Sequence, residues 1–366
     1  MDFELTTEQR DLSGVVQQLA SERRDLDAVT HDPCRVLDTA WHELSDELEL
    51  GGLLIGESDD GLGAGLLDAA VILEELGAAL YGSAFLVAGV AVPLLLSASD
   101  SDAARSLLGE LARSSKKGVA SLDPEAGTEL ELSDDGGIRV TGNVRSVLAL
   151  PSADVLVVPA SLEGVPGVVA VALGQQPVSL RQVQASDLTR PLVDVELVSA
   201  QGDWCPATAE ALERARASIA VGAAAELCGV ARAAMEMGVA HAKRREQFGQ
   251  PIGSYQAIKH LSADMLVAVE GARACTSVAA WSLDSGTMDA TELAAAALVK
   301  AREAAYLCAS TNIQIHGAIG YTWEHDAHHY YRRAVSARQS MVARDELTAW
   351  LLGTSLGPRA SLGVAQ

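Results

Sequence analysis

The sequence has few cysteines and few aromatic side chains. Among its 366 residues are five Cys and 3 Phe, and aromatic residues make up 4%. The cysteines are dispersed, with no Cys-x-x-Cys pair and no repeated spacing. An odd, scattered set predicts reduced thiols in a cytoplasmic protein, most of them filling the core. These cysteines are Cys34, Cys205, Cys228, Cys275 and Cys308.

Basic residues are also scarce. The chain has 27 Lys plus Arg against 49 Asp plus Glu, a formal net charge of −22. A negative field of this size argues against nucleic-acid or anionic-membrane partners, and an anionic ligand would need a local basic pocket. The best local basic clusters are Lys243–Arg245 and Arg332–Arg333.

Long apolar runs and an apolar N-terminal leader are missing as well. The run Ala84–Leu96 is too short to span a bilayer, and Met1–Glu4 is acidic and polar. We therefore expect no signal peptide, no membrane-spanning segment and a cytoplasmic location.

The residue patterns predict three regions in an α+β, mainly α fold. Residues 1–116 form a helical N-terminal domain, residues 117–205 a middle β-sandwich or barrel of short β-branched strands, and residues 206–366 a C-terminal helical bundle. Thr6 and Gln9 predict a capping box, and Leu12, Val15, Val16 and Leu19 a buried face behind it.

Glycine and acidic residues mark further helix ends. Gly77 is expected to end a helix over Asp68–Leu80, and Asp289 to cap the start of a later one.

Two segments near the C-terminus carry the strongest functional signal. Arg245-Glu246-Gln247-Phe248-Gly249, followed by Gln256, ends one Ala-rich helical stretch, and Gln314-Ile315-His316-Gly317-Ala318-Ile319-Gly320-Tyr321 ends another. A guanidinium can bond a phosphate bidentately, and glycines let backbone N–H groups approach an anion closely. Together the segments predict two walls of a site for a phosphate-bearing cofactor.

Their order and spacing resemble the flavin-binding elements of the acyl-CoA dehydrogenase family, and the resemblance covers nearly the whole chain. The architecture is similar too, as are four further segments: Phe3–Gln9, Leu73–Gly77, Asp123–Thr128 and Tyr331–Arg333. The resemblance implies an FAD-dependent α,β-dehydrogenation of an acyl thioester, on CoA or a carrier protein, in lipid metabolism. FAD would lie between the β-domain and the C-terminal bundle, with its adenine end reaching a neighbouring subunit.

The family's cofactor contacts carry over to both segments. Arg245 would pair with the pyrophosphate, Gln247 would hydrogen-bond nearby, Phe248 would pack on the nucleotide, and Gln256 would reach its adenosine side. The alternative is that Arg245 is a charge at a helix C-terminus and the glycines are caps.

The second segment would belong to the partner subunit's copy. Gln314, Gly317 and Gly320 would contact the cofactor from there, and His316 would touch the cofactor or a partner subunit. Ala318 stands where the family usually has a second glycine.

The catalytic glutamate of the family has no match at either usual position. One position falls at Met341, in Ser340–Val342, and the other at Ile219, beside Ala220; neither has a carboxylate. Glu226, seven residues after Ile219 and in an apolar setting, is a weak candidate for a relocated base. Its structural alternative is a buried Glu paired with an Arg.

No other acidic residue is a better candidate for the catalytic base, and the segment expected at the flavin ring also differs from the family. Asp345 and Glu346 follow the expected loop, and their alternative is a solvated helix start; Glu213 is expected at the surface. The family's Trp platform is replaced by Val144–Leu148, in which Ser146 can supply a hydroxyl.

No metal site is expected. His325, Asp326, His328 and His329 invite that interpretation, but adjacent side chains on a helix point about 100° apart. A surface or interface cluster is favoured.

The resemblance implies three alternatives for the whole protein. The first is a subunit without its own base, paired with a homologous acyl-CoA dehydrogenase subunit in an α2β2 tetramer. The second is a homotetramer that uses Glu226, and the third a non-catalytic flavin-binding or scaffold protein.

Overall fold

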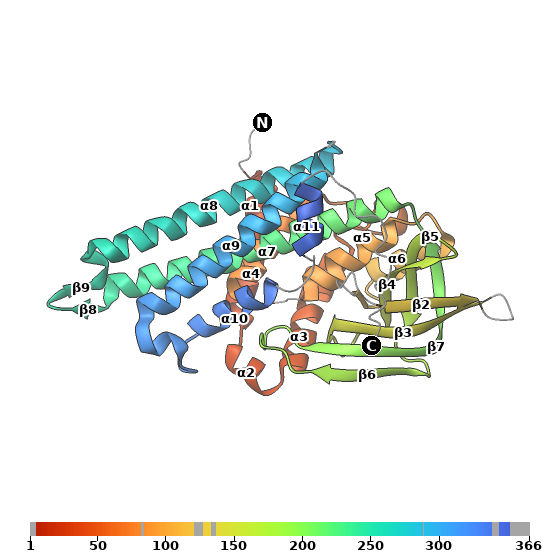
Figure 1. Ribbon diagram of the computed structural model, residues 1–366, viewed down its shortest axis with the longest axis horizontal. Coiled ribbons are helices and arrows are strands. Elements are labelled where there is room, and N and C mark those ends of the chain that lie inside the picture. The colour runs from red at the N-terminus through yellow and green to blue at the C-terminus, as the bar shows by residue number, and fades with distance from the viewer. Residues whose placement is uncertain are drawn as a thin grey trace, which may run out of the picture.

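The computed structural model describes residues 5–81, 84–120, 127–132, 137–287, 289–338 and 344–351. Helices occupy the first part of the chain and the last, with a sheet between them (Figure 1). This confirms the predicted fold class and order of elements; the domain limits remain a prediction. Of the segments that carried the resemblance, Phe3, Glu4 and residues 123–126 lie outside the described residues.

The N-terminal part is built from short helices around α4. Its elements are α1 (Thr7–Arg23), α2 (Leu26–His31), α3 (Pro33–His42), η1 (Glu43–Glu47), η2 (Leu50–Gly52), η3 (Glu57–Asp59), α4 (Leu66–Ala79), η4 (Phe85–Ala91), α5 (Val92–Ser97) and α6 (Asp102–Ala112).

The Thr6–Gln9 capping box at the start of α1 is confirmed, with both of its hydrogen bonds present. Gln9 also donates from Nε2 to Asp68 at 2.9 Å, which ties α1 to α4. The predicted buried face is right at Val16 but wrong at Val15, which is 50% exposed. Because α1 lies at the surface and packs against α4, fewer of its apolar side chains are buried than predicted.

Gly77 does not end α4. The helix continues to Ala79, and Leu80 takes the left-handed conformation instead. A Cβ on Gly77 would lie 2.0 Å from the carbonyl oxygen of Glu226, and one on Gly229 would lie 1.9 Å from that of Glu74. These two glycines therefore let the backbones of two helices touch, a tertiary role that local sequence does not reveal.

The middle strands form one curled sheet, a half-barrel, in the order β1-β4-β5-β7-β3-β2, with β6 also pairing with β7. Only the β1–β4 pair is parallel among the described strands. The long strand β7 holds the sheet together because it pairs with β3, β5 and β6. The strands are β1 (Gly118–Ala120), β2 (Gly127–Leu132), β3 (Ile138–Leu148), β4 (Val155–Leu162), β5 (Val165–Ala172), β6 (Val178–Val183) and β7 (Leu192–Pro206).

The C-terminal part is a bundle of long helices around α7, which packs against α4, α8 and α9 (Figure 1). Its elements are α7 (Ala209–Arg244), β8 (Glu246–Gln247), β9 (Gln250–Pro251), η5 (Ile252–Ser254), α8 (Gln256–Ser285), α9 (Ala290–His316), η6 (Gly317–Tyr321), α10 (Ala327–Ala337) and α11 (Arg344–Leu351). Asp289 is the N-cap residue of α9, as predicted, but its side chain makes no capping hydrogen bond.

Helix α7 is the core helix of the molecule. Among the described helices, it is the one long and apolar enough to cross a membrane, but 83% of its most apolar window is buried inside the protein. Its apolar composition is explained by burial on all sides.

Candidate functional site

The two predicted cofactor segments lie at the same end of the helical bundle. The β8–β9 hairpin follows α7, and η6 follows α9, at the end of the bundle farthest from the sheet (Figure 1). The hairpin turn has positive φ at Phe248 (56°) and Gly249 (81°). Two such residues give the turn the twist of its strands, so the hairpin projects beyond the bundle.

Four predicted residues of the first segment are all exposed. Arg245 caps α7 through its backbone N–H, which donates to the His241 carbonyl at 2.8 Å. Within the described residues its guanidinium has no hydrogen bond or ion pair. Phe248 is 94% exposed, and Gln247 and Gln256 are exposed as well. A free guanidinium, amides and a bare aromatic ring are what a nucleotide diphosphate requires.

The second segment forms a tight loop around its glycines. Gly317, with φ of 66°, ends α9, and a Cβ there would meet nothing within 4 Å. A Cβ on Gly320 would lie 3.1 Å from the His316 Cβ and 3.2 Å from Ile313, so this glycine packs closely. Gln314 and Ala318 are exposed, whereas His316 is buried. The open side of the loop is therefore at Gly317.

The two segments meet within one chain. The rings of His241 and His316 are 4.1 Å apart, and the Asn312 amide lies 3.4 Å from the Met237 sulfur. Both segments therefore lie at one end of the same chain. That the second segment contacts a cofactor from a partner subunit's copy stays a prediction.

The residues expected at the flavin ring are elsewhere. Ser146 lies on β3, in the sheet, at a register shift between Val144 and Val147. It is exposed, has φ of 55°, and its N–H donates to Asp194 at 3.1 Å. This β-bulge aims the residue outward.

Glu226 is enclosed in a buried network of charges. Its Oε1 accepts from Arg333 Nη1 at 2.8 Å and its Oε2 pairs with Arg190. Arg333 is 0% exposed and also bonds the Asp187 carboxylate, at 2.5 Å, and the Thr189 hydroxyl. Both oxygens of Glu226 are thus held by guanidiniums. This is the paired structural alternative, and it argues against a relocated base.

The network joins three parts of the fold, since Asp187 and Arg190 precede β7, Glu226 lies on α7 and Arg333 on α10. Burial alone would raise the pKa of Asp187, but the charge of Arg333 and the Thr189 hydrogen bond leave that pKa below its ordinary value. Sequence reasoning missed Asp187 and Arg190, because no spacing rule connects a loop before a strand with a helix.

Of the two positions where the family's base is expected, the structure describes only the one at Ile219. Ile219 lies on α7 and is 5% exposed, an apolar side chain in the core. Met341 lies outside the described residues, and the side chains of Asp345 and Glu346 are likewise not described.

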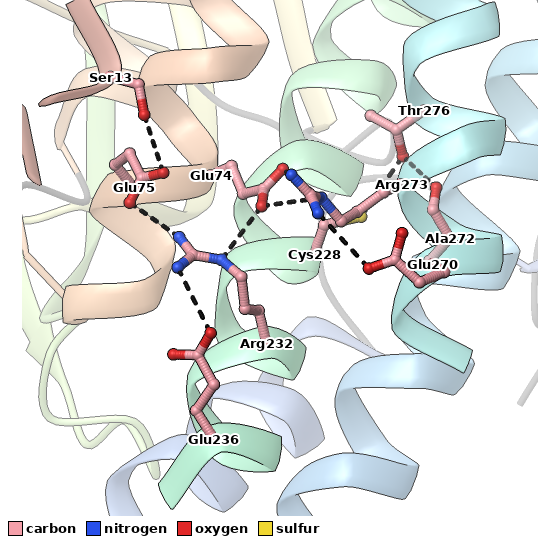
Figure 2. Close-up of polar contacts among 10 residues, drawn as sticks. All are labelled: Ser13, Glu74, Glu75, Cys228, Arg232, Glu236, Glu270, Ala272, Arg273 and Thr276. Atoms are coloured by element: carbon pink, nitrogen blue, oxygen red, sulfur yellow. Dashed lines mark hydrogen bonds and ion pairs between the residues drawn. The ribbon is translucent and has the colours of Figure 1, made fainter. Parts of the chain in front are cut away.

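A second polar cluster lies between α4, α7 and α8 (Figure 2). Arg232 pairs with Glu74 at 3.2 Å and with Glu75 at 2.8 Å, and Arg273 pairs with Glu74 at 3.1 Å. Burial raises the pKa of Glu74 although both arginines oppose the shift. Glu74, Glu75 and Arg273 line a cleft of about 470 Å³, which contains none of the predicted site residues.

The histidines before and in α10 stack on each other rather than converge on a point. The rings of His328 and His329 are 4.1 Å apart, and Trp323 lies 4.7 Å from His328. Burial, followed by the charge of His329, lowers the pKa of His328 to about 4. No group of three or more His, Cys, Asp or Glu in the described part of the chain could hold a metal ion.

Family models and curated relatives cover most of this chain. The acyl-CoA dehydrogenase N-terminal domain matches residues 6–115 and the C-terminal domain residues 205–339. The acyl-CoA dehydrogenase IpdE2 of Mycobacterium tuberculosis is 32% identical over 85% of this chain and 84% of its own length. FadE27 of the same organism is 27% identical over 96% and 97%.

Solved structures share the whole fold. The ChsE4-ChsE5 complex from Mycobacterium tuberculosis matches with a TM-score of 0.83 and 26% identity, over 96% of this chain and 97% of that one. Butyryl-CoA dehydrogenase from Megasphaera elsdenii matches with a TM-score of 0.83 and 22% identity, over 96% and 99%. With both terminal domains and a relative of this similarity, the chain belongs to the acyl-CoA dehydrogenase family of FAD-dependent oxidoreductases.

Proposed function

We propose that this chain is the base-lacking subunit of a hetero-oligomeric acyl-CoA dehydrogenase, which binds the nucleotide half of FAD for a catalytic partner. The observation that carries the proposal is the state of Glu226, whose two oxygens are occupied by Arg190 and Arg333. A general base must lie within reach of the substrate proton, whereas Glu226 is 1% exposed and paired with an arginine on each oxygen. Ile219, at the usual position on α7, cannot take a proton.

The chain's own residues bind and orient the cofactor. Arg245 would pair with the diphosphate, the amides of Gln247, Gln256 and Gln314 would hydrogen-bond around it, and Gly317 would let the backbone approach. Held there, FAD would supply the acceptor for the hydride that leaves the β-carbon of the thioester. The α-proton would go to a carboxylate of the partner subunit, because the buried Ile219 of this chain cannot accept it.

The need for a partner is supported by where the binding groups lie. The β8–β9 hairpin and the end of α9 lie at the end of the bundle farthest from the sheet (Figure 1). Arg245 directly precedes that hairpin, Gly317 directly follows α9, and Ser146 is on β3 of the sheet. A second subunit must therefore bring its sheet to this chain's bundle. The similar ChsE4-ChsE5 structure was solved as a complex of two different chains.

Purification with and without a homologous full-length subunit tests the proposal. We expect the chain alone to show no flavin reduction on adding acyl-CoA, and the co-expressed complex to be yellow and to reduce its FAD. A homotetramer of this chain that reduces its flavin unaided would contradict the proposal.

Two other results would support the other functions. Loss of that unaided reduction in the Glu226→Gln variant would assign the base to Glu226. A yellow protein inert to every thioester, alone and with partners, would favour a flavin-binding scaffold.

A further inference from the structure

Three imidazoles form a continuous stack beside the cofactor segments. His316 lies in the middle, 4.1 Å from the ring of His241 and 4.2 Å from that of His325. His241 is on the last turn of α7, one turn before Arg245, and His316 directly precedes Gly317. The stack therefore joins the two segments that bind the diphosphate in the proposed function.

Hydrogen bonds fix where a proton can be added. His316 Nδ1 lies 2.9 Å from the Asn312 carbonyl, which only accepts, so this nitrogen carries the hydrogen. His325 Nδ1 accepts from the Ala327 backbone N–H at 3.2 Å, so protonating it would break that bond. The half-buried His241 is the ring that can gain a proton at least cost, with the neutral face of His316 against it.

Besides burial, neighbouring arginines and the other imidazoles of the stack lower the pKa values of His241 and His316. Burial lowers the pKa of His241, and His325, Arg245 and Arg244 act in the same direction. Burial lowers the pKa of His316 to about 4, against its hydrogen bond to Asn312, and His241, His325 and Arg244 lower it further. The neutral form is thus favoured for His241 and His316, and both rings feel the positive charge of Arg244.

We propose that His241 takes up a proton when the diphosphate of FAD binds at Arg245 and Gly317. Two negative charges beside Arg245 would reverse the local field, and an opposite charge nearby favours the charged form of a histidine. The proton comes from solvent and goes onto the His241 ring. The inference rests on the proposed cofactor site and makes His241 a further binding residue of it.

The sign of the pH dependence follows from this uptake. The complex binds one proton more than the free chain, so FAD binds more tightly as pH falls. His241 has one pKa in the free chain and a higher one in the FAD complex. If a whole proton is taken up on binding, the Kd of FAD rises about tenfold per pH unit between these two values, and if about half a proton is taken up it rises about threefold. FAD suits the test because its diphosphate is a diester with no proton to exchange near neutral pH.

The experiment uses the protein in the oligomer in which it is purified, stripped of FAD and titrated with FAD from pH 6 to 8. Calorimetry in buffers of different ionisation enthalpy measures the proton uptake directly. His241→Phe keeps a stacking ring but cannot titrate, and His241→Arg carries a permanent charge. We expect both to bind FAD with a Kd independent of pH. The control His31→Gln, an exposed residue of α2, should keep the wild-type slope.

The outcomes separate the inference from the cofactor site itself. FAD binding with no proton uptake and a flat pH profile in the wild type would overturn the role of His241 alone. A His241→Phe variant that keeps the wild-type slope would do the same. No FAD binding at any pH would overturn the cofactor site on this chain, and the inference with it.

Discussion

Replacing Glu226 with Gln separates the two catalytic hypotheses by a stability measurement. In the wild type, Arg190 and Arg333 are balanced by Asp187 and Glu226, and no side chain of the four is more than 10% exposed. The amide keeps the shape but removes one charge, leaving two guanidiniums against one carboxylate. Breaking a buried pair in this way costs about 3–5 kcal/mol.

Such a loss is large for a protein. It corresponds to roughly 4–7 °C in Tm for a chain of this length, measured by circular dichroism or flavin fluorescence during heating. The control is Glu236→Gln on the same helix. Glu236 is 59% exposed and lies 3.9 Å from Arg232, so its loss should stay within about 0.5 kcal/mol.

A double variant tests the cause. Arg190→Met with Glu226→Leu removes one charge of each sign, which leaves Arg333 paired with Asp187. Replacing a buried pair with apolar side chains is often nearly neutral. We expect the double variant to be about 2 kcal/mol more stable than the two single changes add up to. If the wild-type chain reduces its flavin unaided, a Glu226→Gln protein that keeps the wild-type Tm and full FAD but loses this reduction would refute this reasoning and make Glu226 the base.

Four further changes test the cofactor segments and the packing. Arg245→Ala removes a charge-assisted partner worth about 1.5–3 kcal/mol, so FAD affinity should fall roughly 10- to 150-fold, and normal flavin content would contradict the assignment. Gly317→Val places a branched side chain at positive φ on the open side of the loop, and should lower FAD content in the purified oligomer. His328 is 6% exposed and its pKa is lowered from 6.5 to about 4. As pH drops from 6.5 toward 4, the unfolded chain protonates this side chain before the folded chain does, so stability should fall. His328→Leu should flatten that part of a Tm-versus-pH curve. Gly229→Ala puts a Cβ 1.9 Å from a carbonyl of α4 and should cost about 1–3 kcal/mol in urea unfolding, whereas Gly271→Ala, with nothing within 4 Å, should cost nothing.

Sequence patterns predicted the local features well. The Thr6–Gln9 capping box and the long Ala-rich helix before Arg245 depend on neighbouring residues, and both are present. The change from helices to short strands near Gly118 was also predictable from the sequence, because short β-branched runs separated by Gly and Pro are typical of strands.

Contacts between distant segments could not be predicted. Gly77 has the spacing of a helix end, but its role depends on α7 crossing α4 at the Glu226 carbonyl. The partner of Glu226 was expected to be some arginine, and no local rule could select Arg190 and Arg333. The same limit explains the two cofactor segments, whose meeting at His241 and His316 is a property of helix packing.

The buried network and the proposed absence of a base involve the same face of α7. Ile219 and Glu226 are seven residues apart, so they lie on one face of the helix about 10 Å from each other. That face carries an apolar side chain at the usual base position and a carboxylate held by two guanidiniums further along. Arg333, which holds it, lies on α10, shortly after the η6 loop. The carboxylate is therefore used to fix α10 against α7 and the sheet, and through α10 to position the loop at Gly317. In the proposed function, a subunit that binds the nucleotide for its neighbour needs that loop held rigidly and has no use for a second base.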